Sequence, residues 1–217
     1  MHTDVHVPRA GASGILPPAP LVHPCTSQDA LERPALDPTY IRCEAVVNHR
    51  GSVVDYRRYH RSGALVFLTL VTRSRASVLV EPRVRDVFRS AITHVAQRHP
   101  FRTVAYAVMP DHCHLLWRMP LDDGDFSRRV RLLKHFMTRQ QGVPRQLWQA
   151  RFWDHMIRDE SDFVRHLDYI HFNPVKHGHC DAAAEWPDSS YGHYVRKGWY
   201  APDWGVASAQ DARQFGE

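Results

Sequence analysis

Long apolar segments and targeting signals are missing from this sequence. The longest apolar run, residues 64–71, has eight residues and is interrupted by Thr69, whereas a helix needs roughly 20 residues to cross a bilayer. The N-terminal segment MHTDVHVPRAGASGILPPAP has no basic start followed by a continuous apolar stretch, which a secretory signal requires. We therefore expect a cytoplasmic protein with no membrane partner.

Cysteine is scarce, and nucleotide-binding loops are absent. The four cysteines, Cys25, Cys43, Cys113 and Cys180, form no CxxC pair. The sequence therefore predicts neither a zinc ribbon nor a disulfide framework, and we expect reduced thiols. The patterns GxxxxGKS and GxxxxGKT do not occur, which argues against a P-loop that hydrolyses nucleotides.

Lysine is rare as well. Only three of the 28 basic residues are lysine, so 25 are arginine, whose planar guanidinium suits phosphate recognition and stacking on bases. The formal net charge is +5, and acidic residues outnumber basic ones before residue 56, so the basic excess lies in residues 56–217. This pattern is typical of nucleic-acid-binding proteins. A GC-rich genome favours arginine codons in any protein, however, so charge alone leaves the question open.

The chain divides into three parts by composition. Residues 1–50 are rich in proline and have no sustained period of 2 or 3.6, which predicts a disordered extension. Residues 55–180 carry regular hydrophobic patterns and form the predicted domain. Beyond Gly178 the sequence is rich in Trp, Tyr, Pro and Asp with little period, so we expect residues 181–217 to form an irregular tail packed on the domain.

Hydrophobic spacing within the domain predicts four strands and three helices. The strands cover residues 65–72, 101–108, 112–119 and 146–157. The helices begin at Pro82, at Asp125 and at Ser161, and the last of them ends at Phe172 because Asn173-Pro174 follows. The order βαββαβ plus a helix indicates an α+β, ferredoxin-like fold. Such a fold has a four-stranded antiparallel sheet with helices on one face, here followed by a C-terminal helix that bears a tyrosine.

Two histidines share one face of the predicted third strand. In the segment MPDHCHLLW, His112 and His114 point the same way, whereas Cys113 points to the other face. Two imidazoles delivered side by side can hold one divalent ion. In a chain with 16 histidines such a pair also arises by chance, and two exposed strand histidines are the alternative interpretation.

A tyrosine and an asparagine share one face of the last helix. Tyr169 and Asn173 are four residues apart, and Arg165 lies one turn before Tyr169 on the same face. A tyrosine beside a carboxamide could serve as a nucleophile and a metal ligand. Alternatively, Tyr169 is a core aromatic and Asn173 a helix stop before Pro174.

Three segments together resemble a known family. MPDHCHLLW, LWQARFWDHMIRDE and LDYIHFNPVKHG, in this order and spacing, are similar to the REP-associated tyrosine transposases, relatives of the single-strand insertion-sequence transposases of the HUH class. The resemblance covers about residues 55–204. It implies that Tyr169 is the nucleophile and that His112, His114 and Asn173 bind a divalent metal, Mg²⁺ or Mn²⁺; ligand softness would also admit Zn²⁺.

The resemblance also implies a reaction and a substrate. The tyrosine would attack a phosphodiester in single-stranded DNA, form a 5′-phosphotyrosine link and release a 3′-OH that can later rejoin the strand. The implied DNA is an imperfect palindromic hairpin from repetitive extragenic sequence, with a single-stranded tetranucleotide at its foot. Insertion-sequence relatives exchange the tyrosine helix in dimers, whereas a monomer is favoured for the REP-associated members.

Basic and aromatic residues beyond the metal site are predicted to contact this DNA, because arginines interleaved with aromatics suit unpaired bases. These candidates are Arg57, Arg58, Tyr59, Arg128, Arg131, Trp148, Arg151, Arg165 and Lys176. Phe152 and Trp153 are further candidates, but strand alternation sends them to opposite faces, so at least one is expected in the core.

Two rival functions stay open at this point. One is a hairpin-binding protein of the same fold that no longer cuts DNA, which the intact His112, His114 and Tyr169 argue against. The other is a metal-dependent hydrolase of a small phosphoester. It would need an acidic ligand near the histidines, for which Asp111 is the only candidate.

Overall fold

The computed structural model describes residues 60–201 and 203–206. The predicted extension, residues 1–50, and three of the predicted DNA contacts, Arg57, Arg58 and Tyr59, lie outside the described residues. No helix in the described part of the chain is long and apolar enough to cross a membrane.

Four antiparallel strands form the sheet. They are β1 (Leu65–Val71), β2 (Arg102–Val108), β3 (His112–Arg118) and β4 (Trp153–Met156), in the spatial order β2-β3-β1-β4. β2 and β3 form a hairpin whose turn is closed by a hydrogen bond from Met109 N to His112 O of 2.9 Å. The predicted ferredoxin-like α+β arrangement is therefore confirmed.

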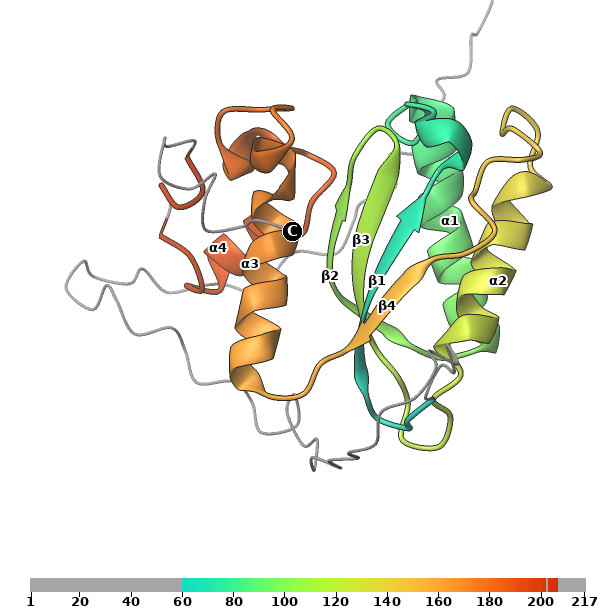
Figure 1. Cartoon of the computed structure of the whole chain (residues 1–217), viewed down its shortest axis with the longest axis horizontal. Coiled ribbons are helices and arrows are strands. Elements are labelled where there is room, and N and C mark those ends of the chain that lie inside the picture. The colour runs from blue at the N-terminus through green and yellow to red at the C-terminus, as the bar shows by residue number, and fades with distance from the viewer. Residues whose placement is uncertain (1–59, 202, 207–217) are drawn as a thin grey trace, which may run out of the picture. The chain divides into compact units, whose positions relative to one another are not determined.

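Two helices cover one face of the sheet. α1 (Pro82–Arg98) and α2 (Phe126–Thr138) lie side by side on the right of the sheet in Figure 1. Alternate β3 residues, Cys113, Leu115 and Trp117, point into the core beneath these helices. The predicted alternation of β3 thus sends Cys113, Leu115 and Trp117 to one face and leaves His112 and His114, together with Leu116, for the other.

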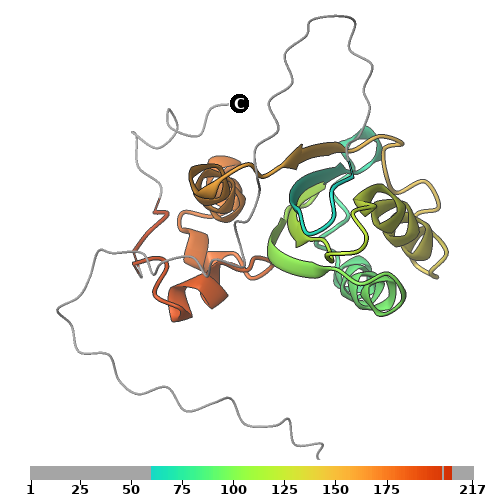
Figure 2. The ribbon, with the colours of Figure 1, turned by 90° about the horizontal axis from the view of Figure 1, so that it is seen from below.

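The other face is covered by α3 (Glu160–Lys176) and by the C-terminal tail, as both views of the ribbon show (Figures 1 and 2). A second core forms there, to which Phe67 of β1, Leu116 of β3 and Leu167 of α3 contribute. The tail is not wholly irregular as predicted, because it contains a 3₁₀ turn (Ala183–Glu185) and a short helix, α4 (Tyr191–Arg196).

Two predicted boundaries were wrong. β4 is shorter than residues 146–157, because residues 146–152 carry no strand and only Trp148 forms an isolated bridge, with Thr72. α3 does not end at Phe172 but continues through Pro174 to Lys176. A proline this close to the helix end removes only one intrahelical hydrogen bond, and the last turn is closed by His177 N, which donates to Asn173 O at 3.0 Å.

A buried histidine fastens the tail to α3. His171 is fully buried, and its Nδ1 lies 3.0 Å from Tyr200 Oη while its Nε2 lies 2.7 Å from Ser190 Oγ. Tyr200 Oη donates to Asp168 Oδ1 at 2.9 Å, so Nδ1–H is the donor to Tyr200 and Nε2 accepts from Ser190. Burial, with a smaller contribution from His193, lowers the pKa of His171 to about 3.

This histidine is expected to make the fold sensitive to acid. Its folded pKa is depressed relative to 6.5, so between pH 6.5 and about 3 the unfolded chain binds the extra proton, and stability falls as pH falls. The contribution is at most about 1.4 kcal/mol per pH unit. In urea unfolding at pH 7, 6 and 5, His171→Gln should show a shallower loss than the unmodified chain by about that slope. Parallel pH dependences would contradict the neutral buried imidazole.

Candidate active site

β3 presents two buried histidines toward α3. His112 and His114 are 4% and 3% exposed, and their ring centroids are 5.0 Å apart. This placement excludes the alternative in which they are merely exposed strand residues. Tyr169 and Asn173 of α3 face them from the opposite side: the Tyr169 ring centroid lies 5.0 Å from that of His114, and Asn173 Oδ1 lies 3.3 Å from His112 Nε2.

The Nδ1 atom of each histidine is held by a neighbour. His112 Nδ1 lies 2.6 Å from Asp111 Oδ1, and His114 Nδ1 lies 2.9 Å from Thr69 Oγ1. Partial burial raises the pKa of Asp111, but the hydrogen bond and charge of His112, with those of Arg75, outweigh it and lower that pKa overall. Asp111 is therefore an ionised acceptor, and its bond fixes the proton of His112 on Nδ1.

This arrangement suits a metal ion. With the His112 proton on Nδ1, its Nε2 and Asn173 Oδ1 are two acceptors facing each other at 3.3 Å, a contact that a cation between them would make favourable. His114 Nε2 and Asn173 Nδ2 are buried and have no hydrogen-bond partner among the described residues. Burial, and then the nearby His112 and His177, keeps the pKa of His114 well below its usual value, so its imidazole is neutral as a ligand must be.

A lysine completes the cluster. Lys176 Nζ lies 5.3 Å from the centroid of the Tyr169 ring, and this ammonium is buried with no hydrogen-bond partner in the part of the chain that the structure describes. A buried ammonium without a partner is costly, so its position over the Tyr169 ring marks a place suited to an anion. The predicted contact Lys176 therefore lies at the site itself.

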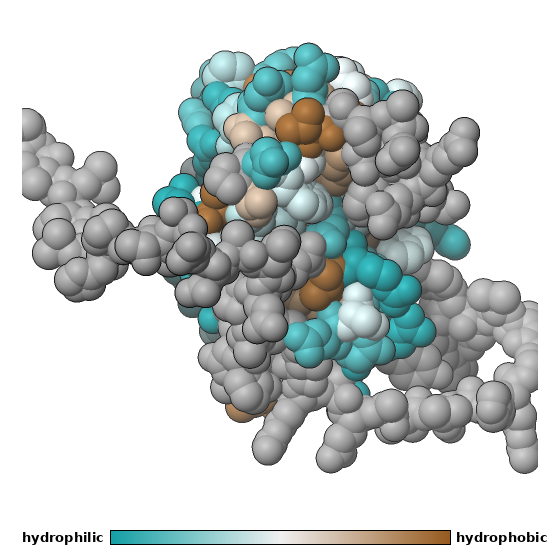
Figure 3. All heavy atoms as spheres, turned by 90° about the vertical axis from the view of Figure 1, so that its left-hand side faces the viewer, coloured by the Kyte–Doolittle hydropathy of each residue, from teal (hydrophilic) through white to brown (hydrophobic). Residues whose placement is uncertain are grey.

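The other predicted DNA contacts are scattered. Arg165 is exposed on α3 and its Nη2 lies 3.4 Å from Asp162 Oδ1. Arg151 is exposed just before β4, whereas Arg128 and Arg131 are exposed on α2, across the sheet from Tyr169. Where described residues are visible on the α3–α4 side of the molecule, hydrophilic residues outnumber a few hydrophobic ones (Figure 3).

Trp148 does not fit its predicted role. It is 8% exposed and belongs to the core under α1 and α2, where its ring centroid lies 6.4 Å from that of Phe88. It was predicted as a DNA contact because it alternates with arginines along the sequence, but that pattern does not show which aromatic residues are buried by other segments. The expectation for the next pair is confirmed: Phe152 packs on the α1–α2 core, and Trp153 points to the other face and is 49% exposed.

Thr69 and Phe67 were not predicted as site residues. Thr69 pairs with His114 in the β1–β3 register, and Phe67 stacks on the His114 ring at 5.3 Å. The one signal for Thr69 was its position as the single polar residue of an otherwise apolar run. Its partner became evident only from the strand pairing.

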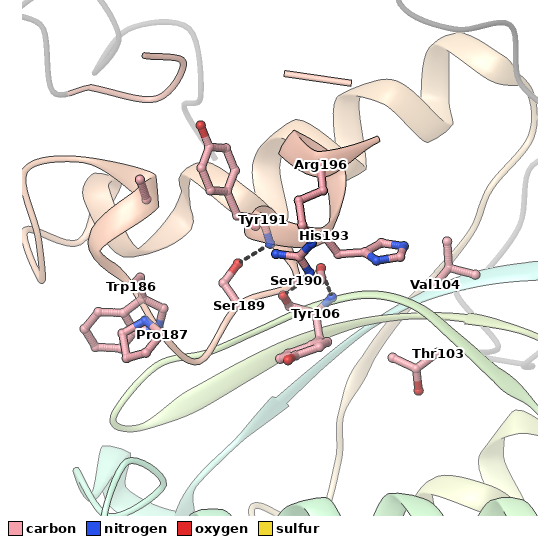
Figure 4. Close-up of a pocket in the computed structure, with 12 residues that line it drawn as sticks. Thr103, Val104, Tyr106, Trp186, Pro187, Ser189, Ser190, Tyr191, His193 and Arg196 are labelled. Carbon is pink, nitrogen blue, oxygen red and sulfur yellow. Dashed lines mark hydrogen bonds between the residues drawn. The ribbon is translucent and has the colours of Figure 1, made fainter. Parts of the chain in front are cut away.

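A pocket lies apart from this cluster, at the edge of β2. It has a volume of about 570 Å³ and is lined by Thr103 and Tyr106 of β2 and by tail residues that include Ser190 and Arg196 (Figure 4). None of the residues around His112 and Tyr169 lines it. The pocket and the histidine–tyrosine cluster are therefore distinct features.

Comparisons with known proteins agree on one family. The family model described as "Transposase IS200 like" matches residues 62–161. A REP-associated tyrosine transposase of Escherichia coli (strain K12) is 40% identical over 150 residues, which are 69% of this chain and 90% of that protein. A Haemophilus influenzae protein with the same family name is 38% identical over 166 residues, 70% of this chain and 93% of its own length.

The chain belongs to the REP-associated tyrosine transposase family. A solved structure of a family member bound to a REP hairpin is also similar, with a TM-score of 0.65 and 37% identity; the match covers 72% of this chain and 96% of that one. The family resemblance predicted from the three sequence segments is therefore confirmed.

Proposed function

We propose that this protein is a metal-dependent tyrosine transposase that cleaves and rejoins single-stranded DNA at REP-type hairpins. The observation that carries the proposal is the convergence of the Tyr169 ring, both histidines and Asn173 between β3 and α3. The similar structure bound to a REP hairpin supports this class of substrate. We further propose that it acts as a monomer, the state favoured for the REP-associated members of the family.

His112 Nε2, His114 Nε2 and Asn173 Oδ1 would hold the metal, Mg²⁺ or Mn²⁺. When bound, the ion supplies electrophilic activation of the scissile phosphate and stabilises the charge that develops on it. Asp111 and Thr69 orient the two imidazoles through their Nδ1 atoms. Lys176 would neutralise a phosphate oxygen beside Tyr169.

The proposed step is a transesterification. Tyr169 Oη loses its proton and bonds to phosphorus, the bond from phosphorus to the 3′-oxygen breaks, and that oxygen takes a proton to become a 3′-OH. The downstream strand stays attached through a 5′-phosphotyrosine. One phosphoester replaces another, so rejoining by the 3′-OH needs no nucleotide hydrolysis, in keeping with the lack of a P-loop pattern.

Metal removal should separate binding from cleavage. We expect most hairpin contacts to lie outside the histidine pair, so EDTA should abolish cleavage while hairpin affinity changes by about threefold or less. The test compares denaturing gels and binding isotherms for a single-stranded hairpin from extragenic repeats of the same organism, with Mn²⁺ and with EDTA. Cleavage that persists in EDTA would contradict the metal role, and tight binding without cleavage in any metal would favour the non-catalytic hairpin-binding protein.

Thr69 is expected to tune metal affinity. Thr69→Val removes the hydroxyl that contacts His114 Nδ1, and loss of such a supporting hydrogen bond typically weakens metal binding or activity by about 10- to 100-fold. The Mn²⁺ concentration for half-maximal cleavage should rise accordingly, whereas Thr69→Ser should keep the native value. Equal Mn²⁺ dependence in both variants would show that Thr69 does not orient the histidine.

A further inference from the structure

Three aromatic rings are stacked beside the candidate active site. The Trp153 and His155 rings of β4 are parallel within 8° at 5.9 Å, and the His155 and His166 rings are parallel within 10° at 4.6 Å. We call Trp153, His155 and His166 the ring stack. Trp153 is its outer member and is 49% exposed, in contrast to the other large hydrophobic residues near the site.

A buried aspartate holds the two histidines of the stack, one through its carboxylate and one through its backbone oxygen. Asp162 is 1% exposed; its Oδ2 lies 2.8 Å from His155 Nε2, and its backbone oxygen lies 2.8 Å from His166 Nδ1. Burial raises the pKa of Asp162, but the hydrogen bonds from His155 and Arg158 outweigh it and lower that pKa to about 2. Asp162 is thus ionised at neutral pH, and both ring nitrogens donate to it.

His155, Asp162 and His166 do not form a convincing metal site. One ligand atom from each of His155, Asp162 and His166 lies within 4.8 Å of the others. A ligand nitrogen directs its lone pair in the plane of its ring, however, so two rings parallel within 10° cannot both aim at one ion. The Asp162 oxygens are also already used, by Arg158 Nε at 3.2 Å and Arg165 Nη2 at 3.4 Å.

The ring stack lies one side chain away from the nucleophile. The Phe67 ring contacts Trp153 at 5.5 Å and Tyr169 at 5.9 Å. Trp153 also pairs with Thr69 across the β1–β4 register, and Thr69 contacts His114. Because β4 is the last strand in the sheet order, the exposed indole lies at an edge of the sheet next to the candidate active site.

We propose that Trp153, supported by His155 and His166, is the stacking site for one unpaired base of the DNA next to the scissile phosphate. The inference rests on the proposed function. One indole face lies against His155, so the exposed part can receive a base, and the two histidines keep the indole from tilting. Arg158 and Arg165, with side chains 67% exposed, flank the stack and can reach neighbouring phosphates.

Stacking rather than net charge would provide the affinity. Asp162 offsets one of the two guanidinium charges, and Asp159 and Glu160 begin the same helix. A base stacked on an aromatic side chain contributes about five- to 150-fold in affinity, largely independent of base identity. Trp153 would therefore fix the position of the unpaired strand relative to Tyr169 without reading its sequence.

A coupling experiment tests this site. The full chain is titrated in EDTA with a REP-type hairpin in which each unpaired nucleotide is replaced in turn by an abasic residue. At one position the abasic residue should weaken binding about tenfold. Trp153→Ala should weaken binding of the intact hairpin to the same extent, and the two changes together should cause no further loss. Trp153→Phe should restore most of the affinity, and Leu121→Ala, a change at an exposed apolar residue (89% exposed), should have no effect.

Other outcomes would overturn the stacking site. Additive losses at every abasic position, or an unchanged affinity in Trp153→Ala, would show that the indole only packs against Phe67. Cleavage of the same hairpin by the unmodified chain with Mn²⁺ is measured in parallel. Cleavage without coupling would contradict the stacking site but not the proposed function. Coupling without cleavage in any metal would support the stacking site and contradict the proposed function.

Discussion

Replacing Tyr169 by phenylalanine is expected to lower the rate of hairpin cleavage by about 10,000-fold or more, because a lost nucleophile typically removes effects of this size. The substitution removes only the hydroxyl oxygen. The ring can still pack against His114 and beneath Lys176, so hairpin affinity should change by about threefold or less. Single-turnover cleavage with Mn²⁺ and a binding isotherm measure the two quantities.

Tyr106→Phe is a matched control for this prediction. Tyr106 lies on β2 and packs toward the α1–α2 core, away from the His112–His114 pair. Its hydroxyl has no place in the proposed chemistry, so this variant should cleave at the native rate. If Tyr169→Phe cleaved as fast as Tyr106→Phe, the nucleophile would be another group, such as a metal-activated water. That result would favour the alternative function, a metal-dependent phosphoester hydrolase.

Replacing His114 by alanine is expected to cause the second-largest loss. The change removes one of two imidazoles whose Nε2 faces the proposed metal position, and losing several kcal/mol of electrophilic stabilisation corresponds to about 1,000-fold in rate. The residual rate should rise with Mn²⁺ concentration over a range in which the native protein is already saturated. Cleavage as a function of Mn²⁺ concentration, measured for both proteins, tests this directly.

His135→Ala provides the comparison for a histidine outside the site. His135 is exposed on α2, on the other side of the sheet, so its loss should leave both the maximal rate and the Mn²⁺ dependence unchanged. A His114→Ala protein with native Mn²⁺ dependence would contradict the assignment of His114 as a ligand.

The local pattern of the sequence was enough to predict most elements and to show which candidate site residues share a face, whereas the family resemblance selected them as the site. Alternation placed His112 and His114 together and Cys113 on the other face, and helical spacing placed Tyr169 above Asn173. These relations lie within single elements, whose geometry depends on the backbone period alone. Phe152 and Trp153 also lie on opposite faces as predicted, although only Trp153 belongs to β4.

The predictions from the sequence that were wrong have a common cause: the true positions depend on contacts between distant segments of the chain. Trp148 was assigned to a strand because its segment is aromatic, but it packs as a core residue under α1 and α2. α3 continues past Pro174 because its last turn is buried: Asn173, Pro174 and Val175 are all packed inside. Tertiary packing here outweighs the usual effect of proline on a helix.

The supporting residues of the site were likewise beyond local reasoning. Thr69 lies 45 positions from His114 in the sequence, and only the register of β1 against β3 brings them together. The ring stack needs β4, α3 and the buried Asp162 at once. A pattern read along one element predicts which side chains share a face, but it does not predict which other element covers that face.

The most direct test of the proposed chemistry is to identify the residue that becomes covalently attached to DNA. A hairpin labelled at its 3′ end is incubated with the full chain and Mn²⁺, and the adduct is digested with trypsin. Tyr169 is the single tyrosine of the peptide that spans residues 166–176. We expect the 3′-labelled strand to be attached to this peptide through its 5′-phosphate, and no adduct in EDTA. Cleavage with no adduct, or an adduct on any other peptide, would contradict transesterification through Tyr169.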